Sequence, residues 1–222
     1  MKLKTLIVTT VICGGFLVRP SIAQTNQLGS AYVSADLGAF ISSRSGFSDT
    51  YNSNAGFAFG GGIGLPLSNH LYLRANASYF SKSGTPWWYT YSFQNGVTTL
   101  VSKTRDGSAK FTQWMVNGGL QYDFFLSNLN SFGVGAGVTY TNFSEKLRSA
   151  NGLGSSDQSG QGVLGFYGGL SGERSFEGSP FAIFADAQYN YARHDVSSVI
   201  GNYGGLNLSI GLRYYFAQRS RE

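Results

Sequence analysis

The residues of this chain best suited to catalysis lie near its C-terminal end, where His194 is followed by Ser197 and Ser198. A histidine within hydrogen-bond reach of a serine can activate its hydroxyl as a nucleophile. On an extended strand, His194 and Ser197 point to opposite faces, because successive side chains alternate. Only a bend at Asp195 brings them together. We therefore expect no catalytic residue and no enzymatic activity.

Other catalytic and ligand-binding motifs are equally poorly supported. His70 lies in a short polar stretch and is expected to be a solvated turn residue. Cys13, the only cysteine, lies in the N-terminal apolar segment, so we expect no thiolate metal site. The glycine-rich stretches 60–64 and 133–137 do not open a helix, as a phosphate-binding loop does. We expect neither a cofactor nor a metal ion.

Six charged residues form a second group of candidate functional residues. Each of them lies within a segment where apolar and polar residues alternate. Opposite charges that share a narrow interior of low dielectric favour pairing, since an isolated buried charge costs several kcal/mol. Whether they share one interior depends on the elements that carry them. The six residues are Asp36, Arg74, Asp123, Glu173, Asp186 and Arg213.

The composition restricts which elements these are. The chain has 222 residues, of which 12% are charged and 15% aromatic, with 31 glycines. So low a charged fraction with so many aromatics excludes a disordered chain or a coiled coil. Beyond the N-terminus, no apolar run approaches the roughly 18 residues of a spanning helix. The remaining class is an all-β protein with many turns.

Eight segments alternate with a period of two, which is the signature of β-strands. In each, one face is apolar and carries no charge, and the other is polar or glycine. We expect these glycines to make room for large inward side chains such as Tyr72, Tyr167, Phe184 and Tyr215. The predicted strands span residues 31–41, 56–65, 71–79, 114–124, 132–140, 164–173, 181–191 and 206–216.

The connections between these strands alternate in length. Long polar stretches cover residues 42–54, 81–110, 144–161 and 195–203, and short ones cover 66–70, 126–131 and 175–180. Aromatics gather at both ends of the apolar faces, as in the girdles that lie at the two membrane interfaces. The pattern predicts an eight-stranded, antiparallel, up-and-down transmembrane β-barrel with short periplasmic turns and long extracellular loops.

The N-terminus indicates export. Lys2 and Lys4 precede an apolar stretch, and Ser21-Ile22-Ala23 provides a small-x-small cleavage pattern. We expect residues 1–23 to be a cleaved secretory signal and 24–222 to be the barrel domain. Without that segment, 13 basic and 11 acidic residues remain of the 16 and 11 in the whole chain. So small a net charge does not favour a nucleic-acid partner.

With this pattern, and with an aromatic Phe216 ending the last predicted strand, the chain resembles the small eight-stranded outer-membrane barrels. These include the transmembrane domain of outer membrane protein A and its OmpX-like relatives. The resemblance implies a monomer in a Gram-negative outer membrane, in contact with its lipid and lipopolysaccharide and inserted by the outer-membrane assembly machinery. Some such barrels modify lipid A with a His-x-Ser pair on one strand, which is missing after His194.

In such a barrel, the polar face lines the lumen. We expect Arg74 to face Asp123, and Arg213 to lie between Asp36 and Asp186. An eight-stranded lumen is about wide enough for side chains alone, which favours a structural network over a gate or a proton path.

The longest loop contains Trp87-Trp88-Tyr89 and the hairpin signal Asn95-Gly96. We expect this hairpin to project above the membrane, with Trp87, Trp88 and Tyr89 as candidate contacts for a surface partner or as a cover of the barrel mouth. The expected function is therefore structural or interactive, in adhesion or envelope integrity. The alternatives are a narrow channel gated by the lumenal charges and a lipid A hydrolase.

Overall fold

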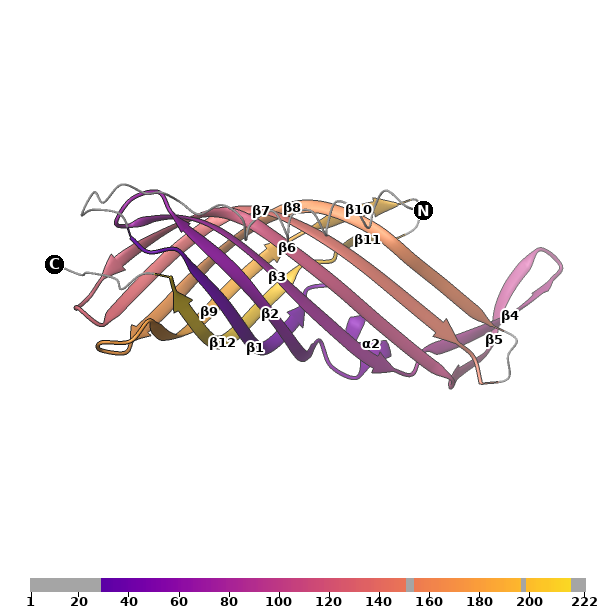
Figure 1. Cartoon of the computed structure of the whole chain (residues 1–222). Helices are drawn as coiled ribbons and strands as arrows, with labels where there is room; N and C mark the ends of the chain where they lie inside the picture. Colours follow the sequence, from indigo (N-terminus) through magenta and orange to yellow (C-terminus); the bar gives the residue numbers. More distant parts are fainter. Residues whose placement is uncertain (1–28, 151–153, 197–198, 217–222) are drawn as a thin grey trace, which may run out of the picture.

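The structure, a computed structural model, describes residues 29–150, 154–196 and 199–216. The predicted secretory signal, residues 1–23, lies outside the described residues. Within them, eight strands form one closed antiparallel barrel (Figure 1). These strands are β1 (Tyr32–Ser42), β2 (Ala55–Pro66), β3 (Leu71–Gly84), β6 (Ser108–Phe125), β7 (Asn130–Arg148), β8 (Ser155–Ser175), β9 (Phe181–Tyr191) and β12 (Gly205–Tyr215).

Strands adjacent in the chain are adjacent in the barrel, so the topology is the predicted up-and-down meander. The barrel closes where β12 returns to β1, in register from Tyr32 opposite Tyr215 to Ser42 opposite Gly205. Closure removes the sheet edges, which is required where no water can satisfy an unpaired backbone group. The predicted fold class is confirmed.

Smaller elements lie at the loop end. A short helix, α2 (Phe47–Tyr51), follows β1, and two hairpins are built from β4 (Trp87–Gln94) with β5 (Val97–Arg105) and from β10 (Arg193–Val196) with β11 (Val199–Asn202). Asn95 and Gly96 join β4 to β5 with positive φ angles of 52° and 79°. A type I′ turn requires such angles at both central residues. The hairpin predicted from this dipeptide is confirmed. In the described part of the chain, no helix has the length and apolar character needed to cross a membrane.

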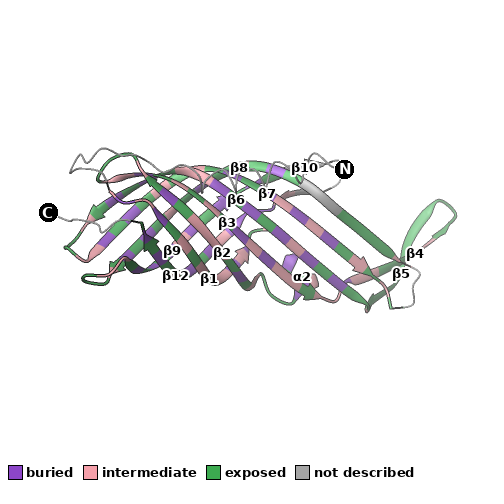
Figure 2. Ribbon diagram, in the orientation of Figure 1, coloured by how far each residue is buried: buried purple, intermediate pink, exposed green. Residues whose placement is uncertain are grey.

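Burial alternates along the strands with the predicted period (Figure 2). On β6, for example, Trp114, Val116 and Leu120 are exposed, whereas Met115 and Asn117 are buried. The exposed apolar side chains form the outer surface, and aromatic rings flank it. At the turn end, Phe181 contacts Tyr214 with ring centroids 5.2 Å apart. This exterior is apolar where it faces the hydrocarbon and aromatic at the interfaces.

The strands β6, β7 and β8 are longer than predicted, so residues 81–110 and 144–161 are not loops throughout. Ser108 pairs with Arg148, and Arg148 pairs with Ser155, well beyond the last apolar outward positions. The prediction placed these residues in loops because it followed the hydrophobic alternation. That alternation ends at the membrane surface, whereas backbone pairing continues above it.

Lumen glycines accommodate large inward rings, as predicted for Tyr167 and Phe184. A Cβ added to Gly119 or Gly137 would lie 2.7–2.8 Å from the Tyr167 side chain, and one added to Gly211 would lie 2.8 Å from the Phe184 ring. Real Cβ atoms do not approach other atoms so closely. These glycines therefore serve packing inside a narrow barrel.

Neighbouring glycines on β6 provide a test of this packing. We expect Gly119→Val to lower the free energy of unfolding by about 1–3 kcal/mol, the usual cost of overpacking. A Cβ added to Gly118 meets nothing within 4 Å, so Gly118→Val is the matched control. Its expected effect is within about 0.5 kcal/mol. Urea unfolding in lipid vesicles measures both, and equal losses in the two variants would contradict the packing role.

Candidate functional site

Arg213 lies at the centre of an ionic network in the turn-side half of the lumen. Its side chain is 1% exposed. From β12, it donates through Nη1 to Glu173 Oε2 on β8 at 2.7 Å and through Nη2 to Ser171 Oγ at 3.1 Å. The same Nη2 lies 3.6 Å from Asp186 Oδ1 on β9. Two carboxylates therefore neutralise one buried guanidinium.

Arg74, on β3, joins this network from the opposite wall. Its guanidinium donates to Asp186 Oδ2, and through Nη1 to Gln121 Oε1 at 2.8 Å. Asp186 thus lies between two arginines. The network links β3, β6, β8, β9 and β12 across the lumen and holds opposite walls of the barrel together.

Two of the predicted pairings differ from the observed ones. Arg74 lies opposite Gly119 in the register, and Asp123 lies four residues closer to the turn, so Gln121 connects them by donating to Asp123 Oδ1 at 2.6 Å. Arg213 lies opposite Ser34, and not beside Asp36, which is half-buried opposite Gly211. The prediction ordered the charges by height along the strands. The register and the reach of each arginine across the lumen decide which pairs form.

Aromatic side chains surround the buried arginine. The Arg213 guanidinium carbon lies 4.7 Å from the Tyr32 ring centroid and 4.3 Å from that of Phe184. The Tyr215 hydroxyl donates to Glu173 Oε2 at 2.6 Å. Cations are attracted to the faces of aromatic rings, and most strongly where water is excluded. The rings therefore fill the lumen around the charges and stabilise the guanidinium.

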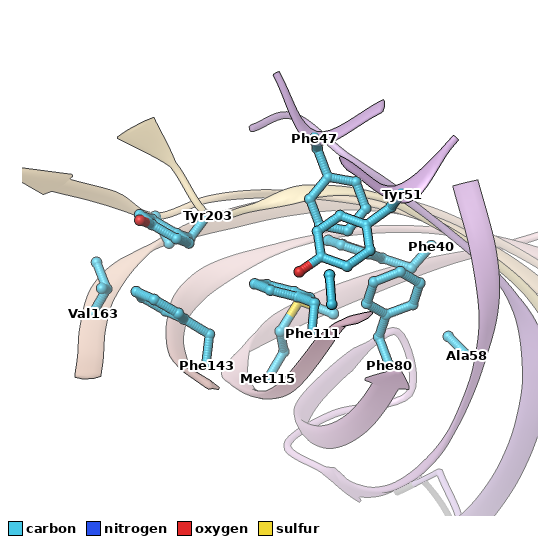
Figure 3. Packing of buried hydrophobic residues seen from close by; sticks show 12 residues of the cluster. Phe40, Phe47, Tyr51, Ala58, Phe80, Phe111, Met115, Phe143, Val163 and Tyr203 are labelled. Atoms are coloured by element: carbon cyan, nitrogen blue, oxygen red, sulfur yellow. The ribbon is translucent and has the colours of Figure 1, made fainter. Parts of the chain in front are cut away.

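A second layer, the aromatic plug, fills the loop-side half of the lumen and was not predicted. Figure 3 shows its rings packed in the barrel interior. Phe40 and Phe80 lie 5.0 Å apart between centroids, and Phe143 stacks on Tyr203 at 3.9 Å. We define the plug as the buried cluster of Phe40, Phe47, Tyr51, Ala58, Phe80, Ala109, Phe111, Met115, Phe143, Val163, Ala192 and Tyr203.

The sequence contained a signal for this layer. Phe40 and Phe80 follow the lumen-facing positions of their strands in steps of two, so the same alternation carries them inward. The predicted lumen face was polar or glycine apart from a few large rings such as Phe184, and it included neither Phe40 nor Phe80. Above the ionic network, an eight-stranded lumen is filled by whatever large side chains point inward, and here many of these are aromatic.

Residues outside the barrel strands complete the plug. From α2, Phe47 packs edge-on against Phe111 at 5.2 Å, and the Tyr51 hydroxyl donates to Glu145 Oε1 at 2.8 Å. Arg44 pairs with Glu145 Oε2 at 2.9 Å. Burial, followed by the neighbouring Glu145 charge, raises the pKa of Tyr51. Tyr51 therefore remains a hydrogen-bond donor, and α2 is fixed in the barrel mouth.

The interior leaves little space for a solute. A cavity of about 10 Å³ lies beside Arg74, Gln121 and Asp186. That volume is roughly what a single water molecule requires.

The three predicted contact residues of the β4–β5 hairpin have different environments. Trp88 Nε1 donates to the Asp106 carbonyl oxygen at 3.1 Å, and its ring packs so closely on Gly154 that an added Cβ would lie 2.8 Å away. Trp87 lies under Lys103, whose Nζ is 4.5 Å from the ring centroid. Tyr89 is exposed. Trp88 therefore anchors the hairpin to the rim, and Trp87 and Tyr89 belong to its outer surface.

The two histidines occupy separate regions. His70 lies in the turn before β3, with Nδ1 2.9 Å from the Asp123 carbonyl oxygen and its ring stacked on Tyr122. His194 belongs to β10, while Ser197 and Ser198 lie outside the described residues. Within the described ranges, no group of three or more His, Cys, Asp or Glu side chains has the arrangement of a metal site.

The ionic network has a measurable role in stability. We expect Arg213→Met to lower the free energy of unfolding by about 3–5 kcal/mol, because it leaves the buried charge of Glu173 without its partner. Adding Glu173→Gln should recover most of that loss, since the unpaired charge is then removed. Denaturant unfolding in lipid vesicles compares the two. A double variant no more stable than Arg213→Met would contradict the pairing.

Comparison with known proteins identifies the fold. No protein-family model and no functionally curated protein matches the sequence. Neisserial surface protein A matches with a TM-score of 0.52 and 19% identity, over 85% of this chain and 99% of that protein. The outer membrane protein OprG of Pseudomonas aeruginosa matches with a TM-score of 0.55 and 12% identity, over 86% and 97%. The chain therefore has the fold of the small eight-stranded outer-membrane β-barrels.

Proposed function

We propose that this protein is a closed outer-membrane barrel that acts at the external surface, through contacts made by its β4–β5 hairpin. The observation that carries this proposal is the hairpin itself, which lies beyond the ends of the barrel strands at the loop end of the molecule (Figure 1). All of β5 is exposed, as is most of β4. A projecting element with exposed aromatic side chains is a typical contact surface.

The attachment of the hairpin supports a defined orientation. Trp88 ties its base to Asp106 and Gly154, and Arg105 donates to the Thr85 carbonyl oxygen at 3.3 Å. Loops that carry function are commonly positioned by a rigid scaffold. The barrel serves as that scaffold, and we infer a non-catalytic role in adhesion or in the integrity of the envelope.

The filled lumen speaks against the alternative of a narrow channel. Any solute has to pass both the ionic network and the aromatic plug, which close the barrel at different heights. The plug is built mainly from aromatic and apolar side chains, so an ion entering it loses most of its hydration. The proposed partners of the barrel are the lipid and lipopolysaccharide around it, the assembly machinery during its insertion and a surface partner of the hairpin. We propose a monomer.

The ionic network and the aromatic plug together make a prediction for conductance. In planar bilayers, we expect the wild type and Arg74→Ala to show no steady openings, because the aromatic plug remains in the variant. Openings should require Arg74→Ala combined with Phe80→Ala and Phe111→Ala. Heat-modifiable migration in gels shows that each variant is folded. Steady wild-type openings that change with Arg74→Ala would instead support the channel.

The hairpin makes a prediction for surface binding. Gly84 pairs with Ala109, so a short Asn-Gly turn can replace residues 85–108 without opening the barrel. We expect this deletion to reduce binding of the nanodisc-embedded protein to erythrocyte ghosts at least about tenfold, the effect of losing about 1.4 kcal/mol. The ghosts present lipid, protein and glycan together. Binding that is unchanged in a folded deletion variant would contradict the proposed function.

A further inference from the structure

The β4–β5 hairpin has two unlike faces. Pairing places Trp87 opposite Arg105, Tyr89 opposite Lys103 and Tyr91 opposite Leu100, with Phe93 next along β4 on the same side. The other side carries mainly hydroxyl and amide groups, such as Thr90 opposite Ser102 and Ser92 opposite Thr99. We define the aromatic face of the hairpin as Trp87, Tyr89, Tyr91, Phe93, Leu100, Lys103 and Arg105.

This aromatic face is exposed over most of its length. Phe93 is 73% exposed, and Tyr91 and Leu100 on the same face are also exposed. In soluble surroundings, so much contiguous apolar surface is unfavourable, and such patches mark interaction sites. The barrel itself does not cover the face.

Residue types along the aromatic face follow a definite order from tip to base. Phe93 lies nearest the tip, Tyr91 and Leu100 follow, and the base has Tyr89 opposite Lys103 and Trp87 opposite Arg105. Lys103 Nζ lies 4.5 Å from the Trp87 ring centroid and 5.4 Å from that of Tyr89, so cations and amphipathic rings occupy the same height. A membrane surface has a matching order, with acyl chains deepest and, above them, the interface where Trp and Tyr lie close to the headgroup phosphates.

The charge of the hairpin fits an anionic surface. Lys103 and Arg105 are its charged side chains, and residues 85–105 contain no aspartate or glutamate. Each basic residue close to an anionic membrane contributes about 1 kcal/mol to binding. Aliphatic side chains at the tip gain free energy from contact with acyl chains, whereas they offer nothing to the hydroxyl groups of a glycan.

The position of the hairpin selects which membrane it meets. On β6, Trp114 in the outer girdle lies six positions after Ser108, where the strand begins near the hairpin base. At about 3.3 Å per residue, this is roughly 20 Å along the strand. The hairpin continues past that level, away from the barrel (Figure 1). Its tip is therefore directed away from the membrane that holds the barrel.

We propose that the aromatic face of the β4–β5 hairpin docks on the phospholipid surface of an opposing membrane that carries anionic headgroups. Phe93 and Leu100 enter the interface, Trp87 and Tyr89 lie at the headgroup level, and Lys103 binds phosphate. This inference rests on the proposed surface function and assigns its partner as lipid.

The experiment measures binding of the nanodisc-embedded protein to separate, protein-free vesicles by flotation. One set contains phosphatidylglycerol and phosphatidylcholine, and the other contains phosphatidylcholine alone. We expect binding to the anionic set, with Lys103→Gln reducing it about fivefold and leaving binding to the neutral set unchanged. Lys146→Gln is the matched control, because Lys146 is an exposed lysine of the same rim outside the hairpin. It should have no effect on either set.

The apolar tip is tested in the same assay. We expect Phe93→Ser to reduce binding to the anionic vesicles about tenfold or more, because the ring no longer enters the interface. Leu126→Ser is the control, since Leu126 is also 73% exposed but lies in a turn at the opposite end of the barrel. Heat-modifiable migration confirms that all four variants are folded.

Two results would overturn the proposal. One is the absence of binding to anionic vesicles, and the other is binding that Phe93→Ser and Lys103→Gln leave unchanged. If erythrocyte ghosts still bind in a hairpin-dependent manner while protein-free vesicles do not, the partner is a membrane protein or glycan. In that case the lipid assignment fails and the proposed surface function stands. If deletion of the hairpin alters neither assay, both fail.

Discussion

The pairing of β1 with β12 is the constraint on which the rest of this structure depends. Hydrocarbon offers no hydrogen bonds to a strand edge, so a sheet that spans it has to close. Closing eight strands leaves a lumen only as wide as the side chains that fill it. Lumen charges then have to pair with one another, and large rings need glycine on neighbouring strands. Arg213 between Glu173 and Asp186, and Tyr167 against Gly119 and Gly137, are direct consequences of this closure.

The two halves of the narrow lumen differ in the chemistry of the side chains that fill them. Near the turns, arginine, carboxylate and amide groups form one network across opposite walls. Towards the loops, phenylalanine rings pack together. The helix α2 covers them, and the hydrogen bond from Tyr51 to Glu145 fixes it in place. Inward side chains of the barrel strands build most of both layers, and α2 adds Phe47 and Tyr51 to the plug, so the lumen of the scaffold is filled. The β4–β5 hairpin extends beyond this scaffold and carries exposed apolar and basic side chains that are available for contacts.

The strands within the membrane were predictable because the bilayer imposes apolar side chains at every second residue. The alternation in Leu206–Phe216, the Asn95-Gly96 turn and the alternation of long and short connections led to the correct fold class. Prediction failed where that constraint ends. Above the girdle, β6 and β7 continue to pair, from Trp114 to Ser108 and from Tyr140 to Arg148, without an apolar outward face to reveal them.

The sequence by itself determined the number of barrel strands, which face of each points inward and which six charged residues these strands carry. Only the tertiary structure decided their partners. Arg74 reaches Asp186 across the lumen, and Gln121 lies between Arg74 and Asp123. The alternation of residues along one strand specifies which face of the sheet a side chain lies on and how high in the barrel it lies. Pairing depends on the shear of the barrel, which places residues distant in sequence at the same level on opposite walls.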